Sequence, residues 1–391
     1  MARIVQKFGG TSVATIERIR SVADIIARSR GNGQDTVVVV SAMAGVTNKF
    51  IGYVRNLGVY EGDPEYDRVV SSGELITAGL LAIALKNLGL NARSYSSWQV
   101  PILTGGNYGH AIIEDINPAN LNGDVSNGVI PVICGFQGIN KEHRITTLGR
   151  GGSDLTAVAV AASIKANLCE IYSDVDGVYT VDPNLYHNAK RMDGINYHEM
   201  LEMASQGAKV LQEQSVDYAM KKNVIIRVVS SFVEGPGTII SGQIPPKNFR
   251  GLAVTPSLSQ IRVAHSANSN SIIDLLEKHF IKAEILKNKE DGKVDILFDK
   301  KKTTVAMHIL KHCNFVNSVR QIIVRRQFSL VSVIGSFISA ETCKILVNTL
   351  LSGKVEVFKL SMMTYKVNLV ISSDKLFESI AILHKYCELE K

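Results

Sequence analysis

The sequence predicts an α/β protein in which a mostly parallel sheet flanked by helices is followed by two smaller ferredoxin-like α+β modules. Three observations predict this class. In the first 240 residues, strand-like runs alternate with helix-like segments, as in parallel sheets covered by helices. A stretch rich in glycine, proline and serine, Ser230–Pro246, then marks a boundary. Beyond it, two stretches of similar length share one order of elements.

The length and composition fit a folded protein of several domains. The chain has 391 residues, of which 46% are hydrophobic and 20% are charged. This balance is typical of soluble globular proteins and not of disordered ones. At about 100–200 residues per domain, the length predicts two or three domains. We place them at residues 1–240, 241–320 and 321–391.

The first part alternates strands and helices. Thr36–Val40 is an uninterrupted β-branched run, as expected for a strand buried on both faces of a parallel sheet. Apolar residues recur at helical spacing from Val13 to Ile26. By the same criteria, further strands are expected at Ile4–Phe8, Val129–Cys134, Cys169–Ser173 and Val224–Val229, and further helices at Glu74–Leu88, Leu155–Lys165 and His198–Gln206.

The second part repeats one β-α-β-β-α order, which is typical of ferredoxin-like modules, and one more strand is expected in each copy. The first copy has expected strands at Gln260–Ala264, Ile281–Leu286 and Lys293–Phe298, and expected helices at Ser271–Phe280 and Thr303–His312. The second copy has expected strands at Ser329–Ile334, Lys354–Leu360 and Lys366–Ser372, and expected helices at Ala340–Leu351 and Lys375–Tyr386.

Cysteine usage, hydropathy and charge exclude several classes of protein. The 5 cysteines form no C-x-x-C pair, which argues against a disulfide scaffold and a cysteine zinc site. No apolar run approaches the roughly 18 residues of a membrane span, and the N-terminus has no signal core. We therefore expect a cytoplasmic protein without a membrane partner. The basic excess lies after residue 240, where the only tight basic runs are Lys300–Lys302 and Arg325–Arg326, so we expect a solvated surface and no nucleic-acid partner.

Two glycine-rich turns carry the first chemical signal. Lys7–Ser12 (KFGGTS) joins an expected strand to an expected helix, and Thr147–Asp154 (TLGRGGSD) opens onto another expected helix. Glycines let a backbone approach a ligand closely, and the free N–H groups of a helix N-terminus face an anion. Lys7 adds a mobile cation, and Arg150 can fork onto a carboxylate or phosphate. The alternative is a pair of plain packing turns, with Asp154 as a helix cap.

Polar residues also follow other strands. Val40–Met43 (VSAM) leaves a buried strand, with Thr47 in the following loop, and Ser72–Glu74 puts a carboxylate at a helix start. Loops at strand ends are where α/β sheets bind ligands. Ser173–Pro183 (SDVDGVYTVDP) follows another strand, and its acids, tyrosine and turn backbone suit a nucleoside or a magnesium shell. The alternatives are turn hydroxyls, compensation of a helix dipole and a surface turn.

Several familiar signatures are absent. The sequence has no P-loop and no H-R-D or D-F-G pair, and Asp154 occupies the final glycine position of a dinucleotide fingerprint. His308 and His312 are four residues apart on an expected helix, but no third ligand at suitable spacing accompanies them, so we expect no resident metal site.

Taken in order, these motifs resemble those of the aspartate kinases, within the amino acid kinase superfamily. The resemblance covers roughly the first 240 residues, and the C-terminal modules resemble more loosely the paired ACT domains of that family. Its carriers are KFGGTS, VSAM, GFQGIN at Gly135–Asn140, TTLGRGGSD at Thr146–Asp154, EIYSDVDGVYTVDP at Glu170–Pro183 and GAKV at Gly207–Val210.

The resemblance implies transfer of the γ-phosphoryl group of Mg·ATP to the side-chain carboxylate of L-aspartate, and a homo-oligomer formed through the ACT-like modules. By the family pattern, Lys7 contacts the transferring phosphoryl group, and we interpret Asp154 as orienting Lys7 or the Mg²⁺ shell. The family pattern assigns aspartate binding to Ser41, Thr47, Glu74, Arg150 and Ser153, and ATP binding to Lys7, Gly9, Gly10, Ser12, Ser173, Asp174, Tyr179, Asp182 and Lys209.

Departures from the family pattern bear on ATP contacts and on regulation. Asn184 stands where relatives often have a basic residue. His265–Asn270 and Gly335–Phe337 lack the Pro-Gly turn of family effector sites, Lys282–Glu284 replaces an Asn-Ile-Asp segment, and the linker Leu286–Gly292 looks short. We expect the modules to pair subunits, while feedback inhibition by lysine or threonine is weakened, altered or lost.

Three other interpretations stay open at this stage. One is a related kinase acting on glutamate, acetylglutamate, carbamate or a nucleotide, against which the duplicated modules and EIYSDVDGVYTVDP argue. Another is a non-catalytic amino-acid sensor, against which Lys7, Arg150 and Asp154 argue. The last is nucleic-acid binding by the basic C-terminal part, which salt-dependent retention on DNA would reveal.

Overall fold

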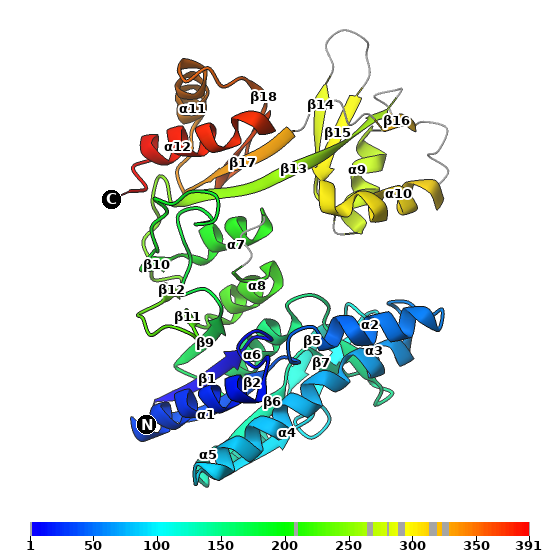
Figure 1. Ribbon diagram of the computed structural model, residues 1–391, viewed down its shortest axis with the longest axis vertical. Coiled ribbons are helices and arrows are strands. Elements are labelled where there is room, and N and C mark those ends of the chain that lie inside the picture. The colour runs from blue at the N-terminus through cyan, green and yellow to red at the C-terminus, as the bar shows by residue number, and fades with distance from the viewer. Residues whose placement is uncertain are drawn as a thin grey trace. The chain divides into compact units, whose positions relative to one another are not determined.

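The computed structural model divides into two compact units, each described here by itself (Figure 1). The first unit comprises Met1–Val178, Arg191–Ser205 and Lys209–Pro245, and the second comprises Tyr179–Lys190, Gln206–Ala208 and Pro246–Lys391. The described residues are 2–206, 210–263, 269–279, 281–287, 294–312, 319–322 and 328–390.

The first unit is built on an eight-stranded sheet with the order β10-β12-β11-β9-β1-β2-β6-β3. Neighbouring strands run parallel except β11 and β12, which confirms the expected mostly parallel sheet. The strands are β1 (Arg3–Phe8), β2 (Asp35–Val40), β3 (Ala92–Tyr95), β6 (Ile130–Cys134), β9 (Leu168–Ser173), β10 (Gly194–Ile195), β11 (Ile226–Ser230) and β12 (Thr238–Ile240).

Helices cover both faces of this sheet. Val38 and Val40 of β2 pack in one core cluster with residues of α1 and α4, which lie side by side in Figure 1. Because strand side chains alternate between faces, the equally buried Val37 and Val39 face the opposite side, where α6 contacts β1, β2 and β9. The helices are α1 (Ile16–Gly31), α2 (Val46–Asn56), α3 (Pro64–Val70), α4 (Ser72–Asn87), α5 (Ala119–Ser126), α6 (Gly152–Ser163), α7 (Tyr197–Ser205) and α8 (Glu213–Lys222).

One stretch among the described residues, Pro64–Asn87, is long and apolar enough to cross a membrane by length and composition alone. It comprises α3 and α4, and half of its most apolar window is buried inside the fold. Leu81 and Leu85 of α4 lie in the core cluster with α1. The apolar residues of this stretch therefore contribute to the core of the first unit.

A second, small sheet in the first unit was not expected from the sequence. It has the order β5-β4-β7-β8 and strands of three to five residues, too short to display an alternating pattern. Its strands are β4 (Ile102–Gly105), β5 (Ile112–Ile116), β7 (Gln137–Ile139) and β8 (Ile145–Thr147).

The second unit contains a seven-stranded sheet with the order β14-β15-β13-β17-β19-β18, in which β16 also pairs with β13 and every pairing is antiparallel. Its strands are β13 (Gly251–Val263), β14 (Ala283–Lys287), β15 (Val294–Asp299), β16 (Val319–Ile322), β17 (Phe328–Ile334), β18 (Val357–Met362) and β19 (Lys366–Ser372), and its helices are α9 (Ser269–Lys278), α10 (Thr303–His312), α11 (Ala340–Ser352) and α12 (Leu376–Tyr386).

The strand β13 joins two cores within this unit. Its first residues pair with β17 beside the core under α11 and α12, and its last residues pair with β15 beside the core under α9 and α10. Both copies of the β-α-β-β-α order are present, which confirms the expected α+β class of the C-terminal part. The expected strand at Gln260–Ala264 was too short, because β13 begins at Gly251.

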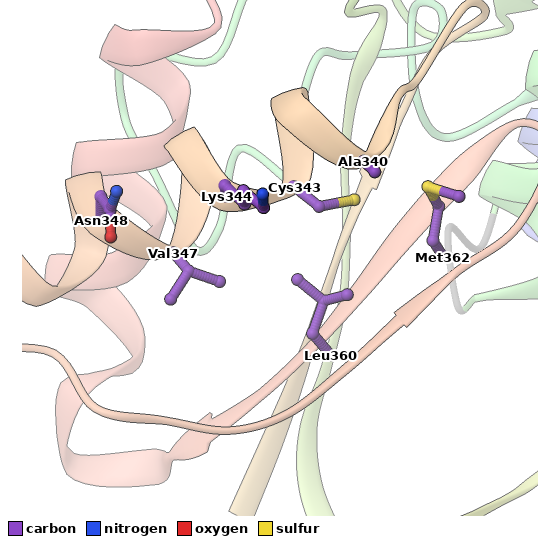
Figure 2. Close-up of a pocket in the computed structure, with 7 residues that line it drawn as sticks. All are labelled: Ala340, Cys343, Lys344, Val347, Asn348, Leu360 and Met362. Carbon is purple, nitrogen blue, oxygen red and sulfur yellow. The ribbon is translucent and has the colours of Figure 1, made fainter.

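An open, mostly apolar groove of about 580 Å³ lies between α11 and the edge strand β18 (Figure 2). Figure 2 shows Cys343 and Val347 of α11 facing Leu360 of β18 across it. Its lining residues are Ala340, Cys343, Lys344, Val347, Asn348, Leu360 and Met362.

Candidate functional site

The loops that follow four adjacent strands meet at one edge of the large sheet. Backbone hydrogen bonds connect them: Gly9 N–H donates to Tyr172 O at 3.2 Å, Ser41 N–H to Phe8 O at 3.1 Å, and Gly135 N–H to Val40 O at 2.9 Å. Since β9, β1, β2 and β6 are neighbours and parallel, their carboxyl ends lie at the same edge. This is the position at which α/β sheets bind ligands.

A buried ion pair lies at the centre of this edge. Lys7 Nζ of β1 is 2.5 Å from Asp154 Oδ1 in the first turn of α6, and the two side chains are only 11% and 10% exposed. A Cβ on Gly9 would come within 3.4 Å of Lys7 Nζ, so the glycine leaves the ammonium uncovered on that side. Asp154 therefore holds the cation in place while the first glycine turn leaves it approachable.

The second glycine turn forms the N-terminus of α6. Gly149 and Gly151 have φ angles of +73° and +74°, which favour glycine, and a Cβ on Gly151 would overlap Gln212. Arg150 between them is exposed and makes no hydrogen bond or ion pair within the described part of the chain. Ser153 is buried and lies against Gly135, whose Cβ would meet it at 2.8 Å. The turn thus presents a free guanidinium beside helix N–H groups.

Glu74 supplies a buried carboxylate near the same edge. Its Oε1 accepts a hydrogen bond from Ala42 N–H at 3.0 Å, and its Oε2 has no hydrogen-bond partner in the described residues. Burial raises the pKa of Glu74 to about 7, against an ordinary 4.5. The loop after β2 also contacts the first glycine turn, because Ala44 N–H donates to Gly10 O at 3.2 Å. The carboxylate is therefore placed to receive a cationic or hydrogen-bond-donating group.

The other expected residues of the loop after β2 are partly exposed. Ser41 directly follows β2 and is half-buried. The expectation that Thr47 lies in a loop was wrong: it lies in the first turn of α2, which begins at Val46 after a left-handed Gly45. Glycine at the N-cap hides this helix start, because the usual Ser, Thr, Asp or Asn signal is missing.

The residues expected at a nucleotide belong to different parts of the chain. Ser173 ends β9 in the first unit, and its hydroxyl donates to Asp174 Oδ1 at 3.0 Å. Tyr179 and the exposed Asp182 belong to the second unit. Asp182 Oδ1 accepts from the backbone N–H and the side chain of Asn184, both at 2.9 Å. Lys209, with most of GAKV, lies outside the described residues.

Sequence reasoning missed Ser231, which joins two of these segments. Its hydroxyl donates to Ser12 Oγ at 2.7 Å, and its N–H donates to Ser173 O at 3.0 Å. Arg18 of α1 donates to Ser231 O at 2.7 Å and lies 4.0 Å from the centroid of the Phe232 ring. In the sequence, the stretch that contains Ser231 indicates only a domain boundary, because glycines and prolines dominate its local pattern.

Sequence reasoning also missed Asp67 of α3. This fully buried carboxylate accepts hydrogen bonds from Gly109 N–H at 2.9 Å and from Thr147 N–H and Oγ1 at 2.7 and 2.8 Å. Burial raises the pKa of Asp67, and the three donors act in the opposite direction. Asp67 therefore anchors the start of the second glycine turn. No local pattern could have identified it, because its partners are distant in the chain.

Comparison with known proteins assigns the family. The model of the amino acid kinase family matches residues 2–230. Over its whole length the chain is 37% identical to the aspartate kinase of Pseudomonas fluorescens (strain SBW25), covering 98% of that protein. The chain belongs to the aspartate kinases of the amino acid kinase family.

Other relatives agree with this family assignment. The chain is 51% identical to aspartate kinase Ask_LysC of Stutzerimonas stutzeri (strain A1501) over 241 residues, which are 62% of this chain and 58% of that protein. The alignments with relatives of this higher identity thus span less than two thirds of the length of those relatives. Escherichia coli aspartokinase III, solved in complex with aspartate and ADP, shares the fold with a TM-score of 0.77 at 24% identity, covering 98% of this chain and 99% of that one. The resemblance drawn from the motifs is confirmed.

The Asp67 anchor makes a testable contribution to stability. We expect Asp67→Ala to lower the free energy of unfolding by about 3 kcal/mol, because it leaves buried donors unsatisfied. Urea denaturation followed by circular dichroism measures this change. The matched control is Asp63→Ala, which removes the N-cap of the same helix and should cost about 1 kcal/mol. Equal losses in the two variants would contradict the anchoring role.

Proposed function

We propose that the chain transfers the γ-phosphoryl group of ATP to the side-chain carboxylate of L-aspartate. The product, 4-phospho-L-aspartate, leads towards lysine and diaminopimelate, threonine and methionine. The observation that carries this proposal is the buried Lys7–Asp154 pair at the sheet edge, between two glycine-rich turns. The 37% identity to an aspartate kinase over the full length of this chain supports the same reaction.

The reaction needs positioning and charge stabilisation more than proton transfer. An aspartate side chain has a pKa of about 3.9, so the attacking carboxylate is already ionised at neutral pH and needs no general base. One carboxylate oxygen bonds to the γ-phosphorus, the bond to the β–γ bridging oxygen breaks, and ADP leaves. Lys7 stabilises the negative charge on the transferring group, and Asp154 keeps the ammonium in place.

The nucleotide is proposed to follow the first glycine turn. Gly9, Gly10 and Ser12 line the phosphate path, with Ser12 held by Ser231. The described residues hold no group of three or more His, Cys, Asp or Glu side chains that could bind a metal ion. This suits Mg²⁺ that arrives on the ATP phosphates and keeps most of its water ligands. The remaining proposed nucleotide contacts are Ser173, Asp174, Tyr179, Asp182 and Lys209.

L-Aspartate is proposed to bind between the loop after β2 and the second glycine turn. Glu74, with its free Oε2, suits the ammonium group of the substrate. Arg150 suits a bidentate contact with a substrate carboxylate, and Ser153 with Ser41 and Thr47 offers hydroxyl groups. In this proposal the substrate carboxylate approaches the phosphoryl group near Lys7.

The C-terminal modules are proposed to pair two copies of the chain in the cytoplasm. The strand β18 is an edge of its sheet, and an edge strand offers unpaired backbone groups to another chain. Met362, which ends β18 and lines the groove of Figure 2, is 50% exposed, and the following Met363 is 46% exposed. An apolar edge of this kind suits a second copy.

Feedback inhibition by lysine or threonine is proposed to be weakened, altered or lost. His265–Asn268 and most of Leu286–Gly292, which carry part of this expectation, lie outside the described residues. Glu284 is described: it pairs with Lys359 and accepts from Ser361 at 3.2 Å and Asn368 at 2.9 Å. Burial raises the pKa of Glu284, but these donors outweigh it and hold the pKa below 4.5. The carboxylate is thus already occupied by the chain's own groups.

The role of Lys7 is tested by Lys7→Ala. We expect kcat to fall at least about a hundredfold, the scale of losing one electrostatic stabiliser. Acyl phosphate formed from ATP and L-aspartate is trapped with hydroxylamine and measured. The control Lys86→Ala, an exposed lysine at the end of α4, should keep the wild-type rate. A near-wild-type rate in Lys7→Ala would contradict the assignment, and ATP binding without turnover in the wild type would favour another acceptor or a sensor.

The raised pKa of Glu74 predicts that aspartate binding depends on pH. With its pKa near 7, Glu74 is protonated at lower pH, whereas an ammonium ligand favours the ionised form. The KM for aspartate should therefore rise up to about tenfold per pH unit below 7 and level off above it. Steady-state assays at several pH values measure this profile. Glu74→Gln should flatten it and raise the KM at pH 8, while Glu65→Gln, an exposed control, should preserve it.

The regulatory proposal predicts weak inhibition. We expect millimolar lysine or threonine, alone or together, to lower the hydroxylamine-trapped rate less than twofold, because an effector ammonium would have to displace Lys359 from Glu284. Strong inhibition of the purified protein at low lysine concentration would overturn this expectation.

A further inference from the structure

A short loop after β11 holds the first glycine turn through a buried serine. This loop, residues 230–234, and the turn both belong to the first unit. Ser12 of the turn is fully buried, and its Oγ accepts a hydrogen bond from Ser231 Oγ of the loop at 2.7 Å. Ser231 is itself only 6% exposed. Because the Ser12 hydroxyl is covered by the protein, Ser12 acts on the phosphate path through the position of the turn.

Arg18 of α1 holds the loop in turn. Its Nη2 donates to Ser231 O at 2.7 Å and to Ser231 Oγ at 3.3 Å. Its guanidinium carbon lies 4.0 Å from the centroid of the Phe232 ring, a contact that favours a cation and restricts the orientation of the guanidinium. One cation thus contacts the backbone, the hydroxyl group and the neighbouring ring of the loop.

These hydrogen bonds form a chain with one direction. A guanidinium can only donate, so Ser231 Oγ accepts from Arg18 and donates its own proton to Ser12 Oγ. Hydrogen bonds in such a chain polarise and strengthen one another. The N–H of Ser231 also donates to Ser173 O at the end of β9, at 3.0 Å. Ser231 therefore ties the turn to β9 as well as to α1.

The glycines of the turn depend on this support. Gly9 N–H donates to Tyr172 O at 3.2 Å, and Gly10 O accepts from Ala44 N–H at 3.2 Å, so both glycines are held by backbone groups alone. In the described part of the chain, Ser12 makes the only side-chain hydrogen bond of residues 9–12. Loss of the bond from Ser231 would therefore leave the turn without a side-chain anchor.

We propose that Arg18, through Ser231, is a positioning residue for the phosphate groups of ATP: it holds Ser12, and with it the backbone of Gly9 and Gly10. This inference rests on the proposed role of the first glycine turn as the phosphate path, and all of its residues lie in the first unit. The described contacts of Arg18 involve no residue proposed to bind L-aspartate, so the effect should fall on ATP.

The test uses two variants of the full chain. Arg18→Met keeps an unbranched side chain but removes the charge and the donors, and Ser231→Ala removes the hydroxyl but keeps the backbone N–H and carbonyl. We expect each to raise the Kd and KM for ATP about tenfold, the scale of one hydrogen bond to a charged group, with the KM for aspartate changed less than twofold. The double variant should raise the Kd by less than the product of the two single effects, because both changes break one chain.

The matched control is Arg28→Met. Arg28 lies on the same helix and pairs with Glu234 of the same loop, but the two side chains are 61% and 84% exposed. Exposed ion pairs contribute little, so this variant should bind ATP within twofold of wild type. Equal losses of affinity in Arg28→Met and Arg18→Met would show that any contact between α1 and the loop suffices, which would contradict the inference.

Chemical rescue separates positioning from a general packing defect. Guanidinium chloride, kept below the onset of unfolding seen by circular dichroism, should restore ATP affinity in Arg18→Ala, because the free ion can donate to Ser231. Sodium chloride at the same concentration should not. A packing defect would instead raise the KM for aspartate together with that for ATP, and guanidinium would weaken ATP binding further. If the Arg18 variants do not fold, the Kd of Ser231→Ala decides the inference.

Direct measurement of ATP binding by calorimetry keeps this inference distinct from the proposed function. Wild-type protein that binds ATP but does not phosphorylate aspartate would overturn the proposed reaction, and the Kd comparison would still decide the role of Arg18. An unchanged Kd for ATP in folded Arg18→Met or folded Ser231→Ala would overturn the inference. A wild-type protein that binds no nucleotide would overturn both.

Discussion

The ion pair between Lys7 and Asp154 is the interaction on which the candidate site depends. Each charge is nearly buried, and leaving either without its partner would cost about 3–5 kcal/mol. The pair exists only if α6 packs tightly on β1, and the alanines and valines of α6, buried almost throughout, permit that approach. The same packing sets the helix N-terminus beside the cation, so stability and chemistry share one contact.

The remaining polar groups of the edge are placed by backbone contacts between loops. Ala42 N–H holds Glu74 and Ala44 N–H holds Gly10, so one connection positions both a buried carboxylate and the first glycine turn. Asp67 and Ser231 do the same for the second glycine turn and for Ser12. Among the described residues, this edge thus combines satisfied anchors such as Asp67 and Ser231 with the unpartnered Glu74 Oε2.

The segment Tyr179–Lys190 belongs to the second unit, although Val178 before it and Arg191 after it belong to the first. In this segment Val181 lies in the core cluster beside α11 and α12, Thr180 is buried, and Asp182 is exposed.

The sequence by itself determined the class of the fold and most of the proposed contacts, because long apolar periodicities and contiguous turn motifs such as Lys7–Ser12 are local signals. Only the tertiary structure decided the small sheet, the helical position of Thr47, the pairing of Lys7 with Asp154 and the hydrogen bonds of Asp67 and Ser231. The physical reason is distance along the sequence. These features consist of short strands or of hydrogen bonds between residues far apart in the chain, and only folding brings the partners together.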